Sequence, residues 1–143
     1  MLDHVAHEVA DLARAARFYD AVVQALGGRR IVDSPGGIGY GRDRPELWLM
    51  PRPQQAAGPA AAEPAAAGPA AAGPPAAGPA PAGHVALSAS GRRAVDAAHG
   101  AGLAAGGRDA GAPAPRPYGP PNYYSGYLVD PDGARLELVS GSR

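Results

Sequence analysis

The 143-residue sequence contains no cysteine and no lysine. The absence of cysteine excludes disulfides, thiolate metal ligands and cysteine nucleophiles. All 13 basic residues are arginines, and 13 acidic residues balance them, so the formal net charge is zero. This balance, without a cluster of basic residues, predicts no nucleic-acid partner and no anionic membrane surface as a partner.

Long apolar runs are also missing from the sequence. No stretch approaches the length needed to cross a membrane, and the first residues lack the basic and apolar regions of a secretory signal. We therefore expect a cytoplasmic protein. The glycine-rich stretches lack the spacing of a phosphate-binding loop, and no signature of a serine nucleophile is present.

One segment differs in composition from the rest of the chain. Residues 54–82 are mostly alanine, proline and glycine, with a proline at every fifth position (Pro59, Pro64, Pro69, Pro74 and Pro79). Proline at this spacing interrupts any helix, and the segment has no large apolar side chains with which to form a core. We predict a low-complexity linker within a single domain, between a first module at 1–53 and a second at 83–143.

The two modules share the same order of predicted elements. The sequences His4-Val5-Ala6 and His84-Val85-Ala86 each begin a short alternating run, and each run is followed by a helical pattern. Asp11 and Ser90 are the expected N-caps of the two helices, and a pair of glycines follows each helix. Strand-like segments complete each module. The sequence thus predicts an α+β fold in which two βαβββ modules form a curved eight-stranded mixed sheet around a cleft, with the helices outside.

A carboxylate stands in the middle of the last predicted strand. Glu137 lies between Leu136 and Leu138, after a tight turn over Asp130-Pro131-Asp132-Gly133. Successive side chains of a strand point to opposite faces, so Glu137 faces away from the two leucines. We therefore expect its carboxylate to face the cleft.

Two histidines occupy equivalent positions at the start of the two modules. His4 and His7 point to opposite faces of the first strand because they are three residues apart, and we expect His4 to face the cleft. His84 begins the corresponding strand of the second module. Two imidazoles and a carboxylate are the ligands of many non-haem Fe(II) sites, so His4, His84 and Glu137 are the predicted metal ligands.

Three motifs resemble those of a known family. They are LDHVAHEVADLARAARFYD at the start, GHVALSA in the middle and YLVDPDGARLELV near the end. Together they resemble the vicinal oxygen chelate superfamily, which includes glyoxalases, bleomycin-resistance proteins and extradiol dioxygenases. The resemblance covers the chain outside 54–82. It implies a divalent metal ion on His4, His84 and Glu137, a small-molecule substrate bound through adjacent oxygens, and a homodimer.

The sequence departs from the glyoxalase pattern at one position. Glyoxalase-type members add a second glutamate from the last strand of the first module, where this chain has Trp48. A site with one carboxylate favours Fe(II) or Mn(II), with Zn(II) or Ni(II) as alternatives. Tyr127 matches the tyrosine that extradiol dioxygenases place before the Asp-Pro turn, although their helper histidine is absent. Tyr127 is the expected catalytic residue, and it shares substrate binding with Trp48 and Tyr123.

Three functions are compatible with these residues. The first is a metal-dependent dioxygenase or a lyase or isomerase of the glyoxalase type. The second is a non-catalytic, drug-sequestering protein of the bleomycin-resistance type, which would bind a flat ligand without metal. The third is a scaffold with an inactive site. The fold does not decide among them.

Overall fold

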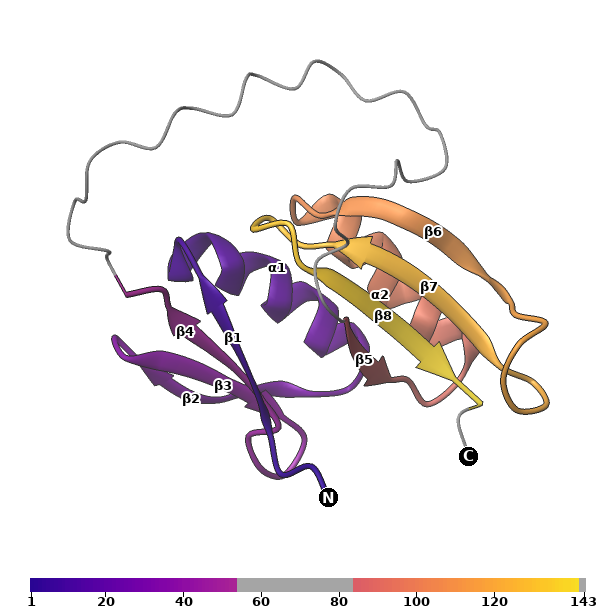
Figure 1. Ribbon diagram of the computed structural model, residues 1–143, viewed down its shortest axis with the longest axis horizontal. Coiled ribbons are helices and arrows are strands. Elements are labelled where there is room, and N and C mark those ends of the chain that lie inside the picture. The colour runs from indigo at the N-terminus through magenta and orange to yellow at the C-terminus, as the bar shows by residue number, and fades with distance from the viewer. Residues whose placement is uncertain (54–83, 142–143) are drawn as a thin grey trace, which may run out of the picture.

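The computed structural model describes residues 1–53 and 84–141, so the predicted linker 54–82 lies outside the described residues. The first module consists of β1 (Val5–Val9), α1 (Leu12–Ala25), β2 (Arg29–Ser34), β3 (Gly37–Gly41) and β4 (Leu47–Pro51). The second consists of β5 (Val85–Ser88), α2 (Arg92–Ala104), β6 (Arg108–Pro115), β7 (Tyr124–Val129) and β8 (Arg135–Ser140). Both modules have the predicted order βαβββ (Figure 1).

Each module forms its own four-stranded sheet. The strand orders are β1-β4-β3-β2 and β5-β8-β7-β6, and in both sheets the first pair is parallel while the other pairs are antiparallel. The α+β class and the two modules are thereby confirmed. The eight strands form two separate sheets. Strands β1 and β5 are edge strands, and neither pairs with a strand of the other sheet among the described residues. No helix of the described chain is long and apolar enough to cross a membrane.

Helix α1 follows the predicted pattern. The side chain of Asp11 accepts a hydrogen bond from the backbone N–H of Arg14 at 2.9 Å, which caps the helix. The helix ends at Leu26, and Gly27 follows with φ of 80°, a left-handed conformation that favours glycine. One face of the helix is buried, with residues Ala15, Ala16, Phe18, Tyr19, Val22 and Val23.

Helix α2 begins one residue later than expected. Its N-cap is Gly91 instead of Ser90, and no side chain caps its first turn. The helix packs against α1 and against its own sheet. Gly102 permits this close approach, because a Cβ atom there would lie 2.5 Å from Leu128 Cδ1 and 3.0 Å from Val22 Cγ2. The core therefore lies between the paired helices and the two sheets.

A buried carboxylate joins the two modules. Asp130, in the turn between β7 and β8, accepts hydrogen bonds on Oδ2 from the Tyr19 hydroxyl at 2.8 Å and from His7 Nε2 at 3.1 Å. Its Oδ1 accepts from the backbone N–H groups of Asp132 and Ala134 at 2.9 and 2.8 Å. Burial raises the pKa of Asp130, but the bonds from His7, Ala134 and Tyr19 outweigh it and lower that pKa below its usual value.

The same turn makes a second contact with the first module. Asp132 Oδ1 accepts a hydrogen bond from the backbone N–H of Ala10 at 3.2 Å and lies 3.0 Å from the guanidinium of Arg14. The residues from Asp130 to Gly133 are thus a turn, as predicted, and they also bind β1 and α1. His7 faces the helix side of β1, as the strand alternation predicts, and its partner there is Asp130.

Asp130→Ala should lower the free energy of unfolding at pH 7 by about 3 kcal/mol, because it leaves buried donors of two modules without an acceptor. A carboxyl whose pKa is lowered by folding contributes stability above its unfolded pKa and loses it as the pH falls. The difference in the free energy of unfolding between wild type and variant should therefore become smaller below about pH 4. Urea unfolding at pH 7 and pH 3 measures this difference. Asp43→Ala, at an exposed aspartate, is the control, and an equal effect of both variants would contradict this role of Asp130.

Candidate functional site

Glu137 lies where strand alternation predicts, on the face of its sheet that α2 does not cover. Its neighbours Leu136 and Leu138 are fully buried on the helix side. Across the sheet, Glu137 is opposite Tyr127 of β7 and in register with Ala86 of β5. The Glu137 side chain is nevertheless only 5% exposed, because aromatic side chains of the same face surround it.

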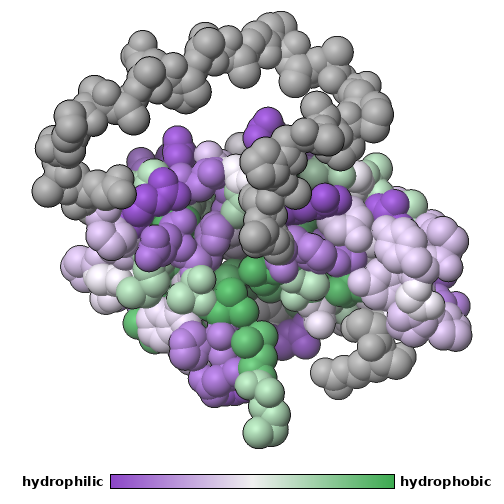
Figure 2. Space-filling model, in the orientation of Figure 1, coloured by the Kyte–Doolittle hydropathy of each residue, from purple (hydrophilic) through white to green (hydrophobic). Residues whose placement is uncertain are grey.

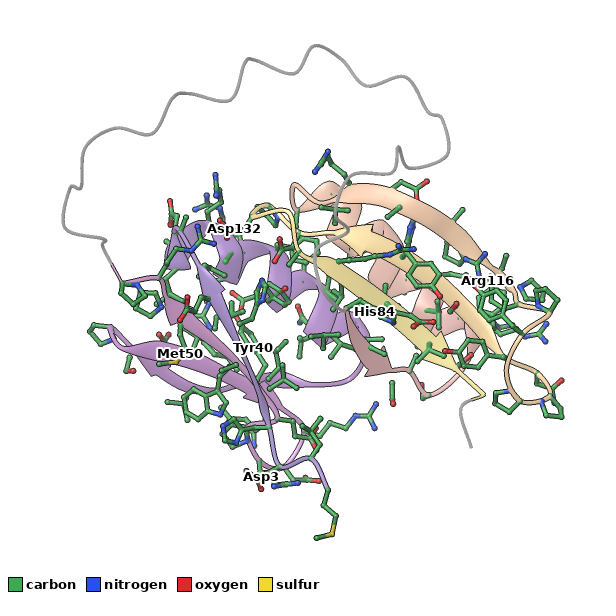
Figure 3. The ribbon with its side chains drawn as sticks, viewed as in Figure 1. Asp3, Tyr40, Met50, His84, Arg116 and Asp132 are labelled. Carbon is green, nitrogen blue, oxygen red and sulfur yellow. The ribbon has the colours of Figure 1, made fainter. Side chains whose placement is uncertain are left out.

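Three side chains donate hydrogen bonds to, or pair with, the Glu137 carboxylate. Its Oε1 accepts from the hydroxyls of Tyr123 and Tyr127, each at 2.9 Å. Its Oε2 lies 2.9 Å from Nε2 of His84. His84 precedes β5 and lies over the β5-β8-β7-β6 sheet, on the side that faces the viewer in Figure 3. These four residues, His84, Tyr123, Tyr127 and Glu137, are called the Glu137 cluster below.

The hydrogen bonds fix the protonation states in the Glu137 cluster. Burial raises the pKa of Glu137, but the bonds from Tyr123, Tyr127 and His84 outweigh it and lower that pKa below its usual value. Burial and the bonds with Tyr118 and Glu137 raise the pKa of Tyr127 to about 12. At neutral pH the cluster therefore contains a carboxylate and protonated tyrosines. The single O–H of Tyr127 is donated to Glu137, so toward a ligand its hydroxyl oxygen can accept a hydrogen bond, and it cannot serve as a base without a further change in its surroundings.

His4 is the residue before β1, and it lies apart from the Glu137 cluster. Its side chain is 52% exposed, and its Nδ1 lies 2.9 Å from Oδ1 of Asp3, which is itself paired with Arg44 at 2.8 Å. Within residues 1–53 and 84–141, no three His, Asp or Glu side chains are grouped closely enough to hold a metal ion. The structure therefore brings together His84 and Glu137, two of the three predicted ligands.

Trp48 takes the place in the first module that Glu137 takes in the second. Trp48 is in register with Ala6 of β1, as Glu137 is with Ala86 of β5. The indole is half-buried and lies over β3, where a Cβ atom on Gly39 would be 3.3 Å from its Cη2. The open face of the first sheet therefore presents an aromatic side chain at the position equivalent to the carboxylate.

A cavity of about 520 Å³ separates β1 from β5. Its apolar lining comes from both modules and includes Val5, Leu47, Val85 and Leu87, and His4 lies at its border. Figure 2 shows hydrophobic surface in the middle of this face, between more hydrophilic regions on both sides. The cavity thus lies between the two unpaired strand edges, beside the face that carries the Glu137 cluster.

Two arginines that the sequence analysis did not identify lie over the ring of Tyr127. The guanidinium carbon of Arg135 is 4.7 Å from the ring centroid, and that of Arg116 is 5.3 Å from it. Strand alternation could have indicated Arg135, since it is two residues before Glu137 in β8 and shares its face. Arg116 follows the end of β6, and no local pattern in the sequence places it near Tyr127.

The spacing of the His84–Glu137 pair allows a test of whether a metal ion fits. Donor atoms bound at about 2.1 Å, on perpendicular axes of one ion, are roughly 3.0 Å apart. The separation of 2.9 Å between His84 Nε2 and Glu137 Oε2 matches this value. Hydrogen bonds from Tyr123 and Tyr127 also hold the Glu137 carboxylate, as second-shell groups hold metal-binding carboxylates. The same separation is an ordinary N–H···O hydrogen-bond length, so the pair is compatible with two positions of an ion but does not by itself indicate one.

Tyr127→Phe should raise the pKa of Glu137, because it removes a donor that stabilises the carboxylate. Carbon-13 NMR titration of the glutamate carboxyl, in metal-free protein, measures this pKa directly. Tyr118→Phe is the matched control, since the Tyr118 hydroxyl is 3.5 Å from Tyr127 and is not bonded to Glu137. An unchanged Glu137 pKa in Tyr127→Phe would show that this hydroxyl does not hold the carboxylate in solution.

Comparison with known proteins agrees with this geometry. A glyoxalase/bleomycin resistance protein from Albidiferax ferrireducens T118 has 25% identity and a TM-score of 0.70, with 97% of each chain covered. Lactoylglutathione lyase from Agrobacterium tumefaciens has 23% identity and a TM-score of 0.59, covering 99% of this chain and 94% of that one. TioX from Micromonospora sp. ML1 has 15% identity and a TM-score of 0.60, with 97% of each chain covered.

No curated protein was found to match the chain. The family model described as Glyoxalase/Bleomycin resistance protein/Dioxygenase superfamily matches residues 1–138, which include the first module, the second module as far as the middle of β8, and every residue of the Glu137 cluster. The resemblance of the three sequence motifs is thereby confirmed. The chain belongs to the Glyoxalase/Bleomycin resistance protein/Dioxygenase superfamily.

Proposed function

We propose that this protein binds a small molecule through adjacent oxygen atoms at the Glu137 cluster, with a divalent metal ion held by His84 and Glu137. The observation that carries the proposal is the separation of 2.9 Å between His84 Nε2 and Glu137 Oε2. Fe(II) or Mn(II) suits these donors best, with Zn(II) or Ni(II) as alternatives. Such an ion would act as a Lewis acid, or as Fe(II) would bind O₂.

His4 is the third ligand in this proposal, and a second copy of the chain supplies it. The support is that His4, the residue before β1, is exposed and lies apart from His84 and Glu137 within one chain. The edges of β1 and β5 are also unpaired among the described strands, which leaves both available to a partner. A homodimer would bring the first module of one copy beside the second module of the other.

The protein side chains orient the ligand. Tyr123 and Tyr127 hold the Glu137 carboxylate, and the Tyr127 hydroxyl oxygen can accept a hydrogen bond from a ligand hydroxyl bound beside Glu137. Trp48 offers an aromatic surface on the other sheet, against which a flat ligand can pack. The site has one carboxylate, since Trp48 stands where a second one would be. This favours dioxygenase-like binding of catechol-type ligands over glyoxalase-type isomerisation.

Metal binding provides the first test of the proposal. His84→Ala, Glu137→Gln and His4→Ala should each weaken Mn(II) affinity about 100-fold or more, because each removes a ligand. His7→Ala is the matched control, since His7 faces the opposite side of the same strand and pairs with Asp130. Isothermal titration of Mn(II) into metal-free protein measures the affinities. Equal losses in His4→Ala and His7→Ala would overturn the assignment of His4.

Mixing two inactive variants tests whether the site is shared between chains. If His4 comes from a partner, a heterodimer of His4→Ala and Glu137→Gln chains contains one site with both substitutions and one intact site. Each heterodimer should then bind one metal ion, whereas the wild-type dimer binds two. The mixture should therefore regain metal binding, although neither variant binds metal alone. A mixture of co-refolded chains that binds no more metal than either variant alone would show that His4 does not act across an interface.

The reaction class follows from a parallel assay with Fe(II), Ni(II), Zn(II) and no metal. With Fe(II) under anaerobic conditions the protein should bind catechol, and Glu137→Ala should abolish that binding. Isomerisation of the methylglyoxal–glutathione hemithioacetal should be undetectable with every metal, because the second carboxylate is missing. Robust isomerisation would contradict the dioxygenase-like assignment.

A second candidate function is sequestration of an aromatic ligand without metal. The observation in its favour is that protein side chains already occupy both oxygens of the Glu137 carboxylate. The cluster would then bind the polar end of a ligand, while Trp48 and the tyrosines contact its flat part. Tight binding of an aromatic ligand that is unchanged by a metal chelator would favour this function over the metal-dependent one.

A further inference from the structure

We infer that Arg135, with Arg116 adding positive charge on the other side of Tyr127, binds an anionic group of the ligand, so that the ligand carries a carboxylate or a phosphate-type group in addition to its adjacent oxygens. This inference rests on the proposed function, because it assigns the far end of a ligand whose oxygens are bound at the Glu137 cluster. It specifies an anionic ligand, and neither the fold nor the Glu137 cluster alone indicates a charge on the ligand.

The first support is the position of the two guanidinium groups. They lie 4.7 and 5.3 Å from the centroid of the Tyr127 ring, and the hydroxyl of the same ring donates to Glu137. One tyrosine therefore contacts the carboxylate at one end and two positive charges over its ring. Arg116 and His84 lie on the same broad face of the second sheet in Figure 3.

The second support is that no carboxylate neutralises these charges. Among residues 1–53 and 84–141, neither Arg135 nor Arg116 has an Asp or Glu oxygen within 4.0 Å, whereas Arg14 and Arg44 each have one and Arg30 has two. The Glu137 carboxylate does not serve this purpose, since its hydrogen bonds come from His84, Tyr123 and Tyr127. Arg135 therefore keeps a positive charge that attracts an anion, and the charge of Arg116 on the other side of Tyr127 adds to that attraction.

The two arginines have different roles. Arg116 is half-buried, and its guanidinium donates hydrogen bonds to Ser125 Oγ at 3.2 Å, to Ser125 O at 2.9 Å and to Ala112 O at 3.1 Å. Those bonds hold its charge in place. Arg135 is exposed and has no hydrogen bond to another described side chain or backbone group, so its fork of N–H donors remains available for a bidentate contact.

The spacing along β8 suits a ligand of one aromatic ring. Arg135 is opposite Val129 and Glu137 is opposite Tyr127, so the two residues are neighbours on one face of the strand. Positions two residues apart in a strand are separated by roughly 6–7 Å. A ring with adjacent hydroxyls at one end and an anionic substituent at the other has a similar length, so both ends can be bound at once.

The experiment compares four probes that share adjacent hydroxyls. They are catechol, 3,4-dihydroxybenzamide, 3,4-dihydroxybenzoate and 3,4-dihydroxyphenylphosphonate, and calorimetry measures their affinities for Fe(II)-loaded protein under anaerobic conditions. At low ionic strength, the affinity for the benzoate or the phosphonate should be at least about tenfold higher than the affinity for the neutral benzamide. The advantage should shrink as salt is added, because Arg135 is exposed. Whichever of the two anionic probes binds more tightly identifies the anionic group that the arginines prefer.

Variants assign the effect to the arginines. Arg135→Gln should remove most of the preference for the anionic probe and leave the affinities for catechol and the benzamide unchanged. Arg92→Gln is the matched control, because Arg92 also lies over a tyrosine ring, that of Tyr124, at 5.3 Å, but comes from α2 on the other side of the sheet. Circular dichroism of each variant confirms that it is folded.

The outcomes separate this inference from the proposed function. If catechol and the benzamide bind but neither anion gains affinity, or if Arg135→Gln weakens all four probes equally, the inference is wrong and the proposed function stands. If none of the four probes binds to metal-loaded protein, the proposed function itself fails. If the anionic probes bind equally well without metal and Arg135→Gln weakens them, the arginines bind the anion in a sequestration site.

Discussion

The buried carboxylate of Asp130 constrains the whole arrangement, because it binds both modules at once. Its partners Tyr19 and His7 belong to α1 and β1, while Asp130 itself begins the turn into β8. The strand that follows this turn carries Arg135 and Glu137. The turn therefore fixes the position and direction of β8 relative to the first module. It thereby also positions the Glu137 cluster, which is built on β8 and its neighbours.

The Glu137 cluster shows how one acidic residue is kept ionised in a nearly buried position. Three donors compensate the loss of water around the carboxylate, and each comes from a different place, namely the start of β5, the residue before β7 and the middle of β7. Because β8 lies between β5 and β7 in the sheet, these donors converge on it from both sides. The sheet order is thus the reason why a single carboxylate is held in a fixed orientation by three donors.

Much of this could be predicted from local patterns. Strand alternation correctly assigned the faces of Glu137 and His7, because a period of two residues depends only on the neighbours in the chain. The role of Asp130 could not be predicted in this way, since its partners Tyr19 and His7 are 111 and 123 residues away. The separation of His4 from Glu137 and the division of the eight strands into two sheets likewise depend on how segments far apart in the sequence are placed, which a local pattern does not contain.

The matching positions of Trp48 and Glu137 have an evolutionary consequence. Two modules of the same order, with these residues in the same register, are what duplication of one ancestral unit would leave. After such an event the two copies are free to diverge, and here one has an acid where the other has an indole. Selection can then alter the shape of the aromatic surface at position 48 without disturbing the charge at position 137, so specificity and chemistry can change independently.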